Sequence, residues 1–107
     1  MTSIISPLIT LPANSQLTLT LSYYLAHGSN SSSADYLRIT IIGNTSQQIF
    51  EELGANNNDN AAWASLTSNI SAFAGQTIKI LIAAADNGTA SLVEAAVDDV
   101  LIQGVLL

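Results

Sequence analysis

Three carboxylates have a strand parity that could place them together on inward faces, where a metal ion could bind. Asp35, Glu94 and Asp98 each share the parity of the apolar side chains in the strand predicted around or beside them. Because alternate residues of a strand point to opposite faces, we expect all three to lean inward at strand ends. Inward carboxylates need a counter-charge or several hydrogen bonds, and the chain's two cations, Arg38 and Lys79, have the outward parity.

Calcium would meet this need, because it takes six to eight oxygen ligands from carboxylates, carbonyls and water. The residues therefore indicate a structural calcium site at Asp98 with Glu94 or Asp35. The alternative is that these acids accept hydrogen bonds from loop N–H groups and fix the ends of their strands.

Carbohydrate binding is the second chemistry that the residue types allow. Tyr24, Tyr36 and Trp63 carry flat rings that can stack on a sugar, and parity places Tyr24 and Tyr36 on outward faces. Aromatic residues make up only 6% of the chain, so such a platform would be thin. The competing interpretation is that these rings, Trp63 above all, pack in the core or along an edge.

Catalysis is not expected, and we interpret the chain as a protein that is not an enzyme. Its single histidine, His27, lies in a predicted Ser/Asn-rich loop, and no G-x-S-x-G sequence is present. The absence of cysteine excludes thiol catalysis, disulfides and zinc–thiolate sites. Carboxylates are numerous enough for glycoside hydrolysis, but a chain this short has no cleft-forming insertions.

Composition limits the partners. With two basic residues and a net charge of −6, the chain cannot neutralise a row of phosphates, so nucleic acids and anionic membrane surfaces are excluded. The longest apolar run, Ile80 to Ala85, is far shorter than the roughly 20 residues of a membrane span, so no membrane insertion is expected.

The balance of polar residues indicates where the protein works. Charged residues make up 9%, whereas Ser, Thr and Asn together number 31, a balance typical of secreted β-modules. No basic signal-peptide start is present, and we expect a mature or interior piece of an extracellular or cell-surface protein.

The elements that must position these side chains are strands, because apolar residues recur with a period of two almost throughout. Strands are predicted at residues 8–11, 17–25, 35–42, 47–53, 62–69, 77–83 and 94–102. Turn sequences such as Gly43-Asn44 separate them, and one helical turn is expected at Ser71 to Ala74, ended by Gly75. The pattern predicts one all-β domain over residues 1–107, an antiparallel β-sandwich of jelly-roll-like or immunoglobulin type.

Several segments follow an order that is known from other proteins. They are Leu11-Pro12-Ala13, Leu19 to Tyr24, Ser33 to Ile39, Trp63, Ile70 to Thr77 and Ser91 to Val100, the S-A-F-A-G-Q-T and V-D-D-V pieces being the most specific. On these motifs, residues 8–102 resemble the MAM-like, carbohydrate-binding-module-like jelly-roll domains appended to secreted bacterial peptidases and surface proteins. The resemblance implies a non-catalytic accessory module for adhesion or for contact with a carbohydrate, protein or other substrate, often with a structural calcium ion.

Apolar segments at both ends support an alternative function. Ile4-Ile5 and Leu8 to Leu11 lie near the start, and Val100 to Ile102 and Val105 to Leu107 near the end. Extended apolar ends are what strand exchange between subunits needs, so the chain could self-associate as the structural subunit of an extracellular β-rich filament. The simpler interpretation is that both ends pair within their own sandwich.

Overall fold

The computed structural model describes residues 2–27, 35–53, 62–85 and 93–107, and at positions 2, 27, 93 and 94 the backbone only. The strands are β1 (Thr2–Ile5), β2 (Ile9–Thr10), β3 (Ser15–His27), β4 (Tyr36–Ile42), β5 (Ser46–Leu53), β6 (Ala64–Asn69), β7 (Thr77–Ala85) and β8 (Val93–Leu106), with a 3-10 turn η1 at Ser71–Phe73. The expected helical turn is thus present, and Gly75 after it has the positive φ of 78° that favours glycine. The largest differences from the predicted strands are the additional β1 and the greater length of β8, which begins one residue earlier and ends four residues later than expected.

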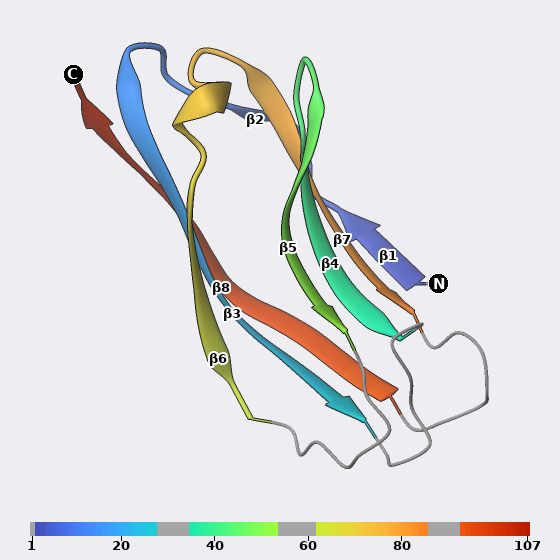
Figure 1. Ribbon diagram of the computed structural model, residues 1–107. Coiled ribbons are helices and arrows are strands. Elements are labelled where there is room, and N and C mark those ends of the chain that lie inside the picture. Colours follow the sequence, from blue (N-terminus) through green and yellow to red (C-terminus); the bar gives the residue numbers. More distant parts are fainter. Residues whose placement is uncertain (1, 28–34, 54–61, 86–92) are drawn as a thin grey trace.

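The strands form two antiparallel sheets, which lie against one another as layers (Figure 1). One sheet has the order β1-β7-β4-β5, with β2 also pairing to β7, and the other has the order β6-β3-β8. The prediction of an all-β antiparallel sandwich is confirmed, while the jelly-roll winding within that class stays a prediction. Both terminal strands pair within the chain's own sheets, β1 with β7 and β8 with β3.

The core lies between the two layers and is built from the alternating apolar residues of β3, β4 and β7. Leu19, Ile39 and Ile78 have no exposed surface. The buried cluster also contains Leu11, Leu17, Leu21, Ile41, Ile70, Phe73 and Ile80. The polar residues that alternate with these core residues along each strand lie on the outer faces of the sheets. A large ligand has access to these outer faces.

A β-bulge interrupts β8. Its pairing with β3 steps from Thr20–Leu101 to Ser22–Asp98, so that one residue of β3 lies opposite two residues of β8. The first of these two, Asp99, has a left-handed φ of 54°. An extra residue reverses the parity of a strand, because side chains alternate with a period of two. Strict alternation counted back from Ile102 would place Asp98 and Ala96 toward the core. Because of the extra residue, the residues of β8 before the bulge that face the core are instead Val97 and Ala95.

Candidate functional site

Two aromatic rings meet on the outer face of the β6-β3-β8 sheet. Tyr23 of β3 pairs with Ala64 of β6, and the next positions along the two strands are Tyr24 and Trp63. The ring centroids of Tyr24 and Trp63 are 4.9 Å apart at an interplanar angle of 75°, an edge-to-face contact. Trp63 is 56% exposed and Tyr24 is half-buried, so more than half of the tryptophan surface is accessible to solvent.

A row of polar side chains lies two residues further along the same face. Ser22 of β3 has Ser65 of β6 on one side and Asp98 of β8 on the other. Asp98 and Ser65 are exposed. The Asp98 carboxylate accepts a hydrogen bond from the backbone N–H of Asp99 through its Oδ1 at 2.8 Å, which helps to hold it in place. Since residues two apart on a strand are separated by about 7 Å, the polar row is within reach of a ligand stacked on Trp63.

These two rows form the candidate site, which we call the aromatic face: Trp63, Tyr24, Ser22, Ser65 and Asp98. An open ring can stack on the apolar C–H surface of a sugar, and adjacent hydroxyls and a carboxylate can hydrogen-bond to its OH groups. The rings are nearly perpendicular, so they present a corner rather than one flat platform.

Tyr36 is not part of this face. It lies on β4 in the other sheet, where the Arg38 guanidinium sits 3.8 Å from the centre of its ring. Arg38 Nε in turn donates to Glu51 Oε2 of β5 at 2.5 Å. One face of the Tyr36 ring is thus covered by the chain itself, so of the three aromatic candidates only Tyr24 and Trp63 come together.

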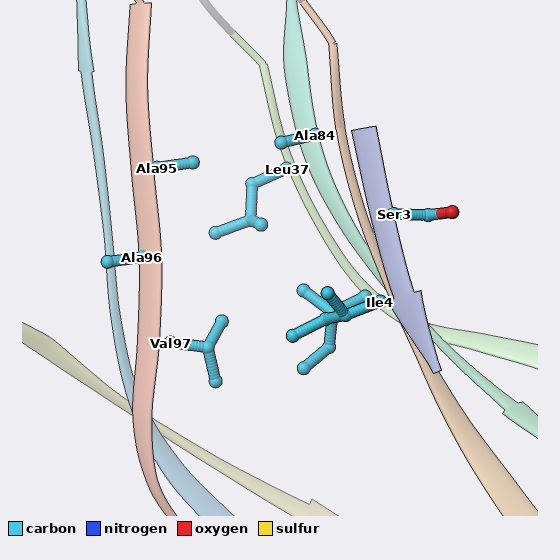
Figure 2. A pocket seen from close by; sticks show the side chains of 8 residues that line it. Ser3, Ile4, Leu37, Ala84, Ala95, Ala96 and Val97 are labelled. Carbon is cyan, nitrogen blue, oxygen red and sulfur yellow. The ribbon is translucent and has the colours of Figure 1, made fainter. Parts of the chain in front are cut away.

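The inward orientation predicted for Asp98 is wrong. Asp98 is exposed, and the residues of β8 that turn inward before the bulge are Ala95 and Val97. Figure 2 shows both of these side chains pointing into the space between the layers, whereas Ala96 points away from it. The physical reason is the extra residue at Asp99, which the period-two count did not include.

The other two predicted metal ligands lie in different places. Asp35 is buried with no exposed surface, as its parity predicted, and it directly precedes β4. Glu94 pairs with Ala26 near the start of β8, in the opposite sheet, and its side chain is outside the described atoms. Among the described side chains, no three histidines or carboxylates gather as a metal site would require. Calcium binding stays a prediction.

Tyr23 has the inward parity in β3, so it lies on the opposite face of this strand from Tyr24. Its ring packs on Phe50 of β5 with centroids 4.5 Å apart, so it links the two layers. Burial, and then the negative charge of Glu52, raises the pKa of the Tyr23 hydroxyl above its ordinary value of 10.0.

An apolar cavity of about 180 Å³ lies between β1, β7 and β4 on one side and β8 on the other (Figure 2). Ile4 and Leu37 point into it from one sheet and Val97 from the other, while the Ser3 hydroxyl points away. Among the described residues, its lining is apolar apart from Ser3 and includes no acid, base or histidine.

No protein-family model matches the chain, and no curated protein has a significantly similar sequence. The resemblance to MAM-like jelly-roll domains thus rests on sequence motifs such as S-A-F-A-G-Q-T and V-D-D-V. Within the described ranges, no helix is long and apolar enough to cross a membrane.

Proposed function

We propose that this chain is a non-catalytic accessory domain of an extracellular protein and that it contacts glycans through the aromatic face. The observation that carries the proposal is the open ring of Trp63, 56% exposed beside Tyr24 and next to a row of hydroxyls and a carboxylate. Exposing so large an apolar ring costs free energy that packing against a ligand would recover.

The charge of the face favours a neutral glycan. Asp98 is its charged member, and the chain has a net charge of −6. The two cations, Arg38 and Lys79, lie on β4 and β7 of the other sheet. Sulfated or uronic-acid polymers would meet like charge at this face, whereas an uncharged polysaccharide would not.

The experiment is a binding assay with insoluble neutral polysaccharides (cellulose, chitin, xylan and starch granules), in which depletion of the protein from solution is measured. We expect Trp63→Ala to weaken binding about tenfold, the loss of one well-stacked ring. Tyr36→Ala is the matched control, because it removes an aromatic ring from the other sheet, and it should bind as wild type does. Equal binding by wild type and Trp63→Ala to every polymer would reject the aromatic face as the site.

Calcium binding and filament formation are tested by separate experiments. Binding of a structural calcium ion is tested by thermal melting in calcium and in EDTA, where a higher melting temperature in calcium supports it.

Filament formation by strand exchange is the second candidate function, and the exposed apolar residues at the end of β8 favour it. Light scattering tests it, because strand exchange that does not close would give a ladder of polymers rather than one species.

A further inference from the structure

The second half of β8 is an unprotected sheet edge. β8 pairs with β3 on one side, and no strand of the described chain pairs with its other side. Figure 1 shows its last residues running along the outside of the molecule toward the C-terminus. An exposed edge of this length presents unpaired N–H and C=O groups that can pair with another strand.

The direction of these groups follows from one hydrogen bond. The N–H of Leu107 donates to the carbonyl oxygen of Asn14 at 2.9 Å, so position 107 is bonded toward the β3 side. In an antiparallel pair, alternate residues bond to the neighbouring strand and the residues between them point the other way. Ile102, Gly104 and Leu106 therefore direct their backbone groups to the free edge.

The side chains beside this edge are apolar and exposed. Leu101 is 49% exposed, Val105 64% and Leu106 78%. These are the features that soluble proteins usually avoid on an edge strand. Asp98 and Asp99, with the bulge between β3 and β8, interrupt the strand at its middle, but the segment from Val100 to Leu106 carries no charge.

We propose that this edge pairs antiparallel with the same edge of a second copy, around a two-fold axis at Gln103. In that register Ile102 exchanges backbone hydrogen bonds with the partner subunit's Gly104, two residues that both face the free edge. Leu101 lies opposite the partner subunit's Val105, so exposed apolar side chains cover each other on both sides of the axis. The contact is isologous and closes as a dimer.

The positions of the negative charges favour antiparallel pairing of the two β8 edges over parallel pairing. Asp98 and Asp99 of the two copies lie at opposite ends of the paired segment, roughly eight residues or 27 Å apart at about 3.4 Å per residue. That separation exceeds the Debye length of about 8 Å at physiological salt. Parallel pairing would place the same aspartates side by side, where like charges directly opposite destabilise a sheet.

The pairing would join two three-stranded sheets into one continuous sheet with the same face of each copy on the same side. This inference does not depend on glycan binding. If the proposed function also holds, the dimer presents two aromatic faces to one polymer and gains avidity without a new contact.

The test is sedimentation equilibrium of the full chain over a hundredfold range of concentration. We expect a reversible change from 11.2 kDa to twice that mass, with the weak affinity typical of a small interface. A mass that stays at the monomer value throughout, or that grows without limit, overturns the proposal. Failure here leaves the polysaccharide assay unaffected, so the two proposals fail separately.

Paired charge variants test the register. The double variant Leu101→Lys, Val105→Lys and the double variant Leu101→Glu, Val105→Glu should each raise the dimer dissociation constant at least tenfold, because like charges meet across the axis. An equimolar mixture should restore dimerisation, because a lysine then faces a glutamate. Leu8→Lys is the matched control, since Leu8 is 67% exposed outside β8, and it should dimerise as wild type does.

Leu106→Pro tests the backbone contribution, because it removes an N–H that faces the free edge and leaves the β3 ladder intact. It should weaken the dimer severalfold with an unchanged circular dichroism spectrum. Charge variants that dimerise like wild type, or a mixture that stays monomeric while both variants remain folded, would contradict the proposed edge.

Discussion

At the scale of single residues, exposure separates the functional candidates from the structural ones. Trp63 is largely open to solvent and is placed on an outer face by its contact with Tyr24. Asp35 is buried without exposed surface, and Tyr23 joins the two layers through Phe50. Arg38 and Glu51 form a partly exposed ion pair of a kind that typically contributes about 0–1 kcal/mol, so we assign it no large role in stability.

Tyr23 leads to a prediction about alkaline pH. Its folded-state pKa is raised above 10.0 by burial and by Glu52. Its contribution to the free energy of unfolding is therefore fully present below pH 10.0 and is lost as the pH rises through the folded pKa, because the unfolded chain ionises first. Urea unfolding at a series of pH values above 9 should show wild type losing stability more steeply than Tyr23→Phe, with Glu52→Gln in between. An identical slope for wild type and Tyr23→Phe would show that Tyr23 is not the group responsible.

At the scale of elements, the bulge in β8 decides which residues face outward. The extra residue brings Asp98 onto the aromatic face and turns Val97 inward. Its backbone is held at Asp99 in a left-handed conformation with a φ of 54°. L-residues other than glycine pay a steric penalty there, which Asn and Asp tolerate better than most.

Replacing Asp99 tests this geometry. Asp99→Gly should stabilise the fold by about 0.5 kcal/mol, because glycine adopts a positive φ without a steric penalty, and Asp99→Val should destabilise it by about 1–2 kcal/mol. A change of 1 kcal/mol corresponds to roughly 4–8 °C in Tm for a domain of this size, so differential scanning calorimetry can resolve both. The control is Gln47→Gly on β5, which has an ordinary strand φ and should lose stability. Glycine effects of the same sign at both positions would contradict the assignment of strain to Asp99.

The register of pairing also limited what could be predicted from the sequence. The alternation in β3 placed Ser22 and Tyr24 on the outward face, which is confirmed. The same count failed for Asp98, because a bulge has no signal in the alternation and Asp99 is not a glycine. That Ser22 lies between Ser65 and Asp98 depends on which strands become neighbours, and this is not written in any local pattern.

At the scale of the whole molecule, the net negative charge opposes association of two copies, whereas the apolar edge of β8 favours it. Each chain carries a net charge of −6, so two copies repel at long range, while the apolar end of β8 attracts at contact. The long dimension of the molecule, 47 Å, is close to the length of fourteen residues of β8 at about 3.4 Å each, so this edge runs along most of the particle.

Ionic strength should therefore strengthen the dimer. Raising sodium chloride from low to physiological concentration shortens the Debye length and screens the repulsion between the copies. Sedimentation equilibrium at the two salt concentrations should show a severalfold lower dissociation constant at the higher one. Weaker association in salt would mean that ion pairs hold the copies together, which the uncharged segment from Val100 to Leu106 cannot supply.

The sequence by itself determined the class of structure, because a period of two depends on neighbouring residues and is visible in one chain. It placed the core faces of β3, β4 and β7, the helical turn before Gly75 and the outward position of Tyr24. Only the tertiary structure decided that Trp63 stands beside Tyr24, that Asp98 turns outward and that β8 is an edge. These properties arise from pairing between distant segments, where one extra residue reverses a face, and no local alternation encodes which strand lies next to which.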